Sequence, residues 1–130
     1  MTTIPHKALV VIADGGKAIL FRNIGKDGAP VALHEEQRLT PKDLQGPSGA
    51  RPDETPSQTE EATFSKQLAD TLHTMKNKND FDAMVLVADP QTLGQLRAAM
   101  HKTVMDTIVL SLSKDLTNHS TNDIAAALNK

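Results

Sequence analysis

The sequence contains no cysteine, no tryptophan and no tyrosine, and it has only three phenylalanines among its 130 residues. Without cysteine, the chain has no disulfide framework, no thiolate metal site and no thiol nucleophile. The scarcity of aromatic side chains removes the platforms on which single-strand nucleic-acid binders stack unpaired bases. These absences exclude several common kinds of site before any motif is considered.

The sequence also lacks a charge excess and a long apolar run. Fourteen Lys and Arg against sixteen Asp and Glu give a net charge of -2, so no basic surface of the kind that wraps nucleic acid is expected. The apolar run Ala8–Ala13 is too short for the core of a signal peptide or for a membrane span. We therefore expect a cytoplasmic protein without membrane contact, in which residues 1–130 form a single domain.

The N-terminal part of the chain predicts an antiparallel meander of three strands. Ala8–Ala13 is apolar throughout, as in a strand that is buried on both faces. After the turn Asp14–Lys17, residues 18–23 alternate in character and predict a second strand that pairs back on the first. A third strand is expected from Val31 to Leu39.

The composition changes sharply at Thr40–Gln58. This stretch holds four prolines and two glycines, and Leu44 is nearly its only large apolar residue. It cannot pack as a regular element, and connections of this length inside a domain are usually either functional or disordered. We therefore expect a flexible loop over residues 40–58.

The second half of the chain alternates helices and strands. Ser57–Glu60 has the spacing of a capping box, and the apolar positions that follow predict a helix over 58–76. The remaining elements are a buried strand over 83–88, a helix that begins at Asp89–Pro90, a half-exposed edge strand over 108–113 and a C-terminal helix over 120–128. The order β-β-β-α-β-α-β-α predicts an α/β fold, with a five-stranded mixed sheet between helices as in RNase H-like three-layer domains.

The turn Asp14-Gly15-Gly16-Lys17 raises a choice between a phosphate-binding loop and a hairpin. A phosphate-binding loop needs a glycine at position 11, a Ser or Thr after the lysine and a helix that follows. The sequence has Val11 and Ala18 at these positions, and a strand pattern follows. A hairpin turn is therefore the better interpretation.

Carboxylates follow the first and fourth predicted strands. If these strands are neighbours in the sheet, Asp14 and Asp89 lie at the same sheet end, and Glu60 or Glu61 at the start of the long helix would join them. Such a cluster would hold Mg²⁺ for a metal-dependent nuclease or phosphodiesterase. Each carboxylate also suits a structural role, in a turn, at a helix N-cap or in a capping box. The nuclease therefore stands as the alternative hypothesis, and otherwise no cofactor or metal is expected.

Three stretches of the sequence resemble the bacterial host-attachment protein family, which is described as a relative of the archaeo-eukaryotic release-factor middle domain. They are the Ala-Asp-Gly turn after the first strand, the run Ala88–Arg97, and Lys114–Thr117. The resemblance extends from Leu9 to Leu128. It implies an RNase H-like fold, in agreement with the element order.

The resemblance also implies a function. In the release factors, the loop between the third strand and the first long helix carries a Gly-Gly-Gln tip that positions water for peptidyl-tRNA hydrolysis. The corresponding loop here holds Gln45, Gly46, Gly49 and Arg51, but no Gly-Gly-Gln. The resemblance therefore implies a non-enzymatic protein that binds the ribosome or another RNA-containing partner through these loop residues. Because no secretion signal is visible, we expect any effect on host attachment to be indirect.

Overall fold

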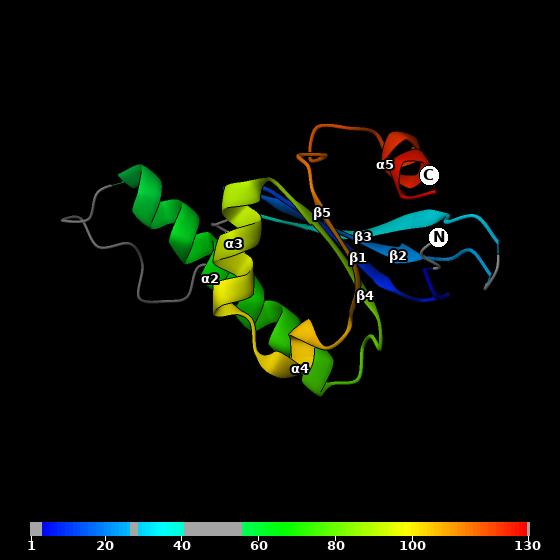
Figure 1. Cartoon of the computed structure of the whole chain (residues 1–130), viewed down its shortest axis with the longest axis horizontal. Helices are drawn as coiled ribbons and strands as arrows, with labels where there is room; N and C mark the ends of the chain where they lie inside the picture. Colours follow the sequence, from blue (N-terminus) through cyan, green and yellow to red (C-terminus); the bar gives the residue numbers. More distant parts are fainter. Residues whose placement is uncertain (1–3, 27–28, 41–55, 130) are drawn as a thin grey trace.

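The computed structural model describes residues 4–26, 29–40 and 56–129, with side chains in the long helix from Phe64 onward (Figure 1). Five strands form one mixed sheet in the order β3-β2-β1-β4-β5. The elements in chain order are β1 Leu9–Ala13, β2 Ala18–Asn23, β3 Leu33–Leu39, α2 Pro56–Asn77, β4 Met84–Ala88, α3 Pro90–Ala99, α4 Lys102–Met105, β5 Ile108–Ser113 and α5 Thr121–Leu128.

The sheet combines an antiparallel half with a parallel half. β1 pairs antiparallel with β2, and β2 pairs antiparallel with β3, as the predicted meander requires. On its other side β1 pairs parallel with β4, which pairs parallel with β5. The predicted α/β class and the five-stranded mixed sheet are confirmed, and the predicted neighbours, the first and fourth strands, are adjacent. The RNase H-like name for this arrangement stays a prediction.

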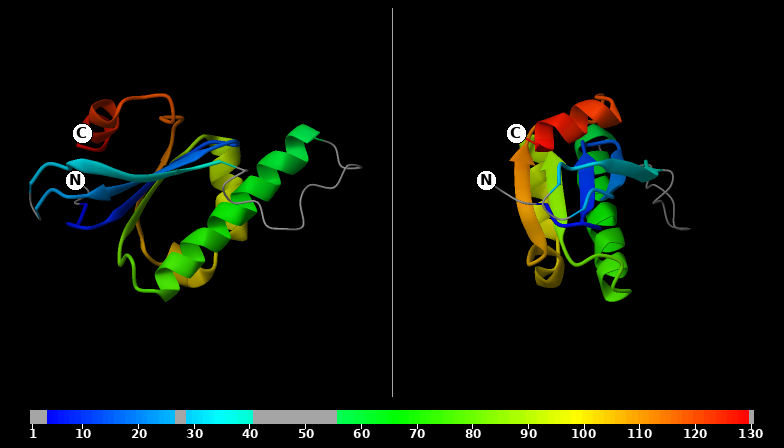
Figure 2. Two further views of the ribbon diagram at one scale, coloured as in Figure 1. Left: turned by 180° about the vertical axis from the view of Figure 1, so that it is seen from behind. Right: turned by 90° about the vertical axis from the view of Figure 1, so that its right-hand side faces the viewer.

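The two faces of the sheet carry separate apolar cores because β1 and β4 are buried on both sides. On one face, α2, α3 and α4 cover alternate strand residues, with Phe64, Leu96 and Val104 among the buried side chains. On the other face lies α5 (Figure 2), whose Ile124 and Leu128 are buried in the second core. Helices therefore form a layer on each side of the sheet. In the described ranges no helix is both long and apolar enough to cross a membrane.

Two element starts differ from the sequence-based expectation by more than one residue. α2 begins at Pro56, so the last residues of the predicted loop belong to a helix, which starts with proline at a position where its missing N–H is not needed. β3 begins at Leu33 rather than Val31. Before it, the Ala32 N–H donates to the Asn23 Oδ1 at 3.2 Å, and the Val31 N–H and carbonyl bond to the Asn129 side chain at 2.6 and 3.2 Å. Residues 41–55 of the predicted loop lie outside the described residues.

The short helix α4 is an addition to the predicted element order. It spans Lys102–Met105 between α3 and β5 and buries Val104 against the same core as α2 and α3. Four residues form a single turn, which is too short for an apolar periodicity to be seen in the sequence. α4 therefore changes the connection into β5 without changing the sheet.

Candidate functional site

The three parallel strands end at the same level. The register pairs Ala13 with Ala88 and Ala88 with Ser113, so the residues that follow β1, β4 and β5 lie along one end of the sheet. In open α/β sheets, ligands bind outside the carboxyl ends of the strands. We call this end the carboxyl edge and define it by Asp14–Lys17, Asp89 and Lys114–Asn118.

The first part of the carboxyl edge is the turn between β1 and β2. The Asp14 Oδ1 accepts from the backbone N–H groups of Gly16 and Lys17, each at 2.8 Å. The Asp14 N–H donates to the Lys17 carbonyl at 2.9 Å, which closes the turn. The predicted hairpin turn is therefore confirmed, and a strand rather than a helix follows the lysine, which excludes the phosphate-binding loop.

The second part is the segment Lys114–Asn118, which leaves β5 and reaches the β1–β2 turn. The Lys17 Nζ donates to the Asn118 Oδ1 at 2.9 Å, and the Thr117 Oγ1 lies 2.9 Å from the Asp14 Oδ2. Because β4 lies between β1 and β5 in the sheet, the segment crosses the carboxyl end of β4 on its way. These side chains bind two loops that lie about a hundred residues apart in the sequence into one surface.

At the centre of the carboxyl edge one hydroxyl serves two carboxylates. The Thr117 Oγ1 lies 2.9 Å from the Asp14 Oδ2 and 2.6 Å from the Asp115 Oδ1. A threonine hydroxyl carries a single proton, so it donates to one of the two carboxylates at a time. Thr117 is only 3% exposed, which keeps its hydroxyl away from a substrate and identifies it as a structural bridge. We call Asp14, Thr117 and Asp115 the hydroxyl bridge.

The electrostatics of the hydroxyl bridge favour an ionised Asp115. Hydrogen bonds from the Thr117 hydroxyl and the Thr117 backbone N–H hold the pKa of the Asp115 carboxyl below its usual value, with smaller contributions from Lys17 and His119. Hydrogen bonds to a carboxylate stabilise its charged form, which is the cause of this direction. A negative charge on the exposed Asp115 therefore belongs to the surface of the carboxyl edge at neutral pH.

Asp89 lies at the end of β4 and caps the helix that follows. Its Oδ2 accepts from the Thr92 N–H at 3.1 Å, and Pro90 occupies the first helical position, as the sequence predicts. Asp14 and Asp89 thus follow neighbouring strands, but each carboxylate already accepts hydrogen bonds within its own turn or helix. Among the described side chains, those of residues 4–26, 29–40 and 64–129, no group of three His, Cys, Asp or Glu is arranged to hold a metal ion.

The remaining predicted site residues have side chains outside the described part of the structure. Glu60 and Glu61 lie within α2, but their side chains fall outside the described part of the structure, so a third metal ligand there stays a prediction. The predicted partner-binding residues Gln45, Gly46, Gly49 and Arg51 also lie outside the described residues.

The role of Thr117 was not predicted from the sequence. The stretch Lys114–Thr117 stands out in the sequence only as a mark of family resemblance, and nothing in it indicates a contact with Asp14, 103 residues away. The available signal was the position of this stretch directly after a strand, at a sheet end that already carried Asp14 and Asp89. The direction that the segment takes could not be inferred from its residues.

The chain was compared with known protein families. Residues 7–128 match the family described as Bacterial archaeo-eukaryotic release factor family 12. The chain belongs to this family. No curated protein matches the chain closely enough to be counted as a relative. For this family 12 chain, the release-factor side of the resemblance is supported, whereas the match does not bear on the host-attachment name.

The stretches that resemble the family lie at the carboxyl edge. The three stretches that carried the resemblance are the turn at Asp14, the run that begins at Ala88 and the stretch Lys114–Thr117. All three begin where a parallel strand ends, and two of them are joined by the hydroxyl bridge. The carboxyl edge of this family 12 chain is therefore the candidate functional site.

Proposed function

We propose that this chain is a non-enzymatic protein linked to translation, which binds the ribosome through its carboxyl edge and through residues 40–58. The observation that carries the proposal is the family match over residues 7–128. β3 ends at Leu39 and α2 begins at Pro56, so these residues connect the third strand with the first long helix. That is the place in the element order where the release factors carry their catalytic tip.

The absence of catalysis in this proposal rests on residue types. Residues 40–58 contain Gln45-Gly46 and Gly49 but no Gly-Gly-Gln, which is the sequence that positions water in the release factors. At the carboxyl edge, Asp14 and Asp89 accept hydrogen bonds from their own turn and helix, and the Thr117 hydroxyl is buried. These groups support a shaped binding surface better than a set of reactive side chains.

The proposed binding is expected to depend on shape more than on phosphate contacts. In the part of the chain that the structure describes, each arginine already has an intramolecular partner: Arg22 pairs with Glu36 at 3.1 Å, Arg38 pairs with Glu35 at 3.0 Å, and Arg97 donates to the Ser111 hydroxyl at 2.8 Å. The net charge of -2 adds no general attraction to RNA. We therefore expect a weak salt dependence, in contrast to proteins that neutralise many phosphates.

The proposal places the protein in the cytoplasm with the ribosomes, and it makes any effect on host attachment a consequence of altered translation. This part of the proposal separates a direct adhesin from an indirect one. A purified chain that bound host cells directly, with the same affinity as it bound ribosomes, would contradict it.

The decisive experiment is co-sedimentation of the full chain with purified ribosomes. We expect the chain to pellet with ribosomes at salt concentrations of about 50 mM and about 200 mM alike, because few phosphate contacts are involved. Replacing residues 42–55 by a Gly-Ser linker of equal length is expected to abolish co-sedimentation. Failure of the wild-type chain to pellet under both conditions would overturn the proposal.

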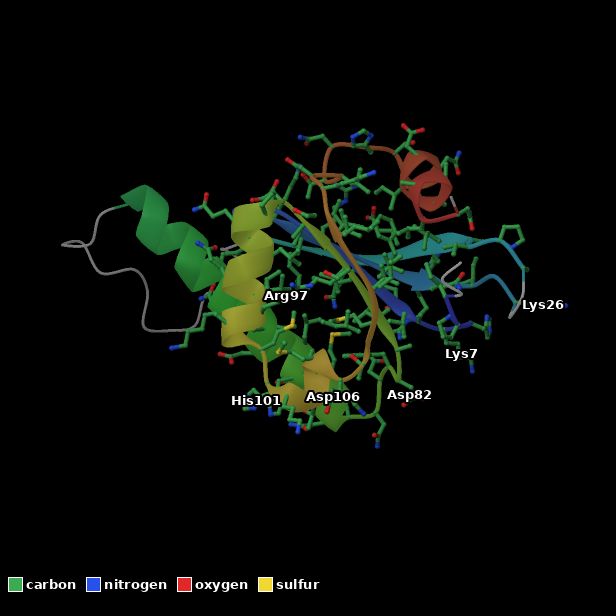
Figure 3. The ribbon with its side chains drawn as sticks, viewed as in Figure 1. Lys7, Lys26, Asp82, Arg97, His101 and Asp106 are labelled. Carbon is green, nitrogen blue, oxygen red and sulfur yellow. The ribbon has the colours of Figure 1, made fainter. Side chains whose placement is uncertain are left out.

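A matched pair of lysine substitutions locates the surface. Lys17 belongs to the carboxyl edge, whereas Lys26 follows β2 at the opposite end of the sheet (Figure 3). We expect Lys17→Gln to weaken ribosome binding and Lys26→Gln to leave it unchanged. Equal effects of the two substitutions would exclude the carboxyl edge. Release of peptide from peptidyl-tRNA by the wild-type chain would contradict the non-enzymatic part of the proposal.

A further inference from the structure

The two edge strands of the sheet, β3 and β5, differ in the residues that they expose to solvent. At one edge, β3 exposes the polar run His34–Arg38, and its Arg38 and Glu35 form an ion pair at 3.0 Å. At the other edge, β5 has the sequence Ile-Val-Leu-Ser-Leu-Ser, without any charged residue. Natural proteins protect exposed strand edges with charged side chains, because an unprotected edge is a template for another strand. β3 has this protection and β5 does not.

The outer side of β5 is open. β5 is the last strand in the sheet order and pairs only with β4, and it forms the outer border of the sheet in the right-hand view of Figure 2. Within the described residues, no backbone hydrogen bond joins β5 to a segment other than its sheet partner. Its outward N–H and carbonyl groups are therefore available to a further strand.

Exposed apolar side chains lie along the same border. Val109 is 40% exposed and Met105, at the end of α4, is 39% exposed. The register between β4 and β5 passes from Met84 with Ile108 to Val85 with Leu110, so Val109 is an extra, bulged residue. A bulge often discourages pairing at an edge, but here the bulged residue is apolar and gains from being covered.

The charged residues at the two ends of β5 indicate which strand could pair with its open side. Asp106 precedes the strand (Figure 3) and Lys114 follows it, and both side chains are exposed. Among the described residues, neither takes part in an ion pair. In an antiparallel pairing of β5 with β5 of a second copy, the start of one strand meets the end of the other. Asp106 of each copy then lies beside Lys114 of the other.

From these observations we infer that β5 is a self-pairing edge, at which two copies of the chain join their sheets in antiparallel register around a two-fold axis at Leu110. This register places Asp106 opposite Lys114 twice, and it opposes Val109 to Ser111. A register centred on Ser111 would bring the two Arg97 guanidinium groups together, because Arg97 donates to the Ser111 hydroxyl at 2.8 Å. The Leu110 register keeps these like charges apart.

The inference is tested on the whole chain by sedimentation velocity over roughly a hundredfold range of concentration, since association follows mass action. We expect a monomer–dimer equilibrium. Val109→Lys places a charge at the pairing edge, at a position exposed enough to leave the fold intact, and is expected to yield a monomer. Val109→Thr, which is β-branched and uncharged, is the matched control and is expected to retain the dimer. A wild-type chain that stays monomeric, or a dimer unaffected by Val109→Lys, overturns the inference.

A charge exchange tests the register itself. Asp106→Lys and Lys114→Asp each replace two attractive pairs by two repulsive ones, and we expect each to weaken the dimer by about two- to thirtyfold, the range expected for two exposed pairs. The double variant Asp106→Lys with Lys114→Asp restores both pairs and is expected to recover the wild-type dimer. A double variant that is as weak as the single ones would rule out the register centred on Leu110.

Discussion

Two polar clusters lie at opposite ends of the sheet and differ in how completely their hydrogen bonds are made. At the end of β2, the Asn23 side chain is 1% exposed and donates to the carbonyls of Ile4 and Pro5 at 3.1 and 2.9 Å. Its Oδ1 accepts from the N–H groups of Gly25 and Ala32 at 3.0 and 3.2 Å. Every donor and acceptor of this amide is therefore used.

The hydroxyl bridge at the carboxyl edge is the opposite case. There the single proton of Thr117 faces two carboxylates, and Asp115 reaches solvent. A fully satisfied buried cluster holds the architecture and gains nothing from a partner. A cluster with spare acceptor capacity at the surface is able to take a further donor, as functional sites do. The contrast teaches that the Asn23 end stabilises the fold and the Asp14 end is available for binding.

The largest predicted effect tests the Asn23 end. Asn23→Ala removes the hydrogen-bond partner of the Ile4 carbonyl and of the Gly25 and Ala32 N–H groups, whereas the Pro5 carbonyl keeps the Ala8 N–H. We expect it to lower the free energy of unfolding by about 3 kcal/mol. The matched control is Asn118→Ala, which removes one exposed contact with Lys17 and is expected to cost less than about 0.5 kcal/mol. Urea denaturation of both variants measures the difference. Equal losses would erase the distinction between the two ends.

A pair of glycine substitutions is expected to have opposite signs. A Cβ at Gly25, within the Asn23 cluster, would collide with the Pro30 carbonyl oxygen and lie 3.2 Å from the Asn23 Oδ1. Gly25→Ala must therefore move backbone atoms, and we expect a loss of about 2 kcal/mol. Gly94 lies within α3 with open space around the same position, so Gly94→Ala is expected to stabilise the protein by about 0.5 to 1 kcal/mol. Thermal denaturation measures both, and a stabilising Gly25→Ala would contradict the close packing of this cluster.

The hydroxyl bridge predicts a smaller effect that depends on pH. Thr117→Val removes the shared hydroxyl, and we expect a loss of about 1 to 2 kcal/mol at neutral pH, limited because Asp115 recovers hydrogen bonds from water. The native pKa of Asp115 lies below its unfolded value of about 3.9. The stabilisation from its charged form is thus present above that pH and is lost as the pH falls through the native pKa.

The pH dependence of the Thr117→Val effect can be measured directly. Because Thr117 is the largest cause of the lowered pKa of Asp115, the stability difference between the wild type and Thr117→Val should narrow as the pH falls below about 4. Denaturant titrations at several pH values follow the difference, and an NMR titration of the Asp115 carboxyl follows its pKa. A difference that stays constant as the pH falls would show that Thr117 acts through packing rather than through its hydrogen bonds to Asp115.

Local signals in the sequence predicted most of the fold. The apolar runs at Ala8–Ala13 and 83–88 indicate strands buried on both faces, and each is such a strand in the structure. The Asp89–Pro90 pair predicts a capped helix because capping involves only neighbouring residues. These predictions succeeded because their causes lie within a few residues of one another.

The remaining features depend on contacts between distant segments. The Asn129 side chain accepts a hydrogen bond from the Val31 N–H, although 98 residues separate the two. The Thr117 hydroxyl reaches Asp14 only because the segment after β5 crosses the end of β4. The residue pattern does not determine the path that such a segment takes. It therefore predicted that Asp14 and Asp89 lie at one sheet end, but it did not predict the hydroxyl bridge at that end.

The smallest predicted effect tests whether Asp89 has a structural role as a helix cap or a functional role at the carboxyl edge. Asp89→Ala removes the acceptor for the Thr92 N–H at the start of α3, and we expect a loss of about 1 kcal/mol, whereas Asp89→Asn retains a good N-cap and is expected to cost little. Neither substitution should alter any Mg²⁺-dependent cleavage of nucleic acid, because we expect the wild-type chain to have none. Cleavage by the wild type that Asp89→Asn abolishes without loss of stability would assign Asp89 to a metal site. The carboxyl edge would then be an active site, and the non-enzymatic proposal would fail there.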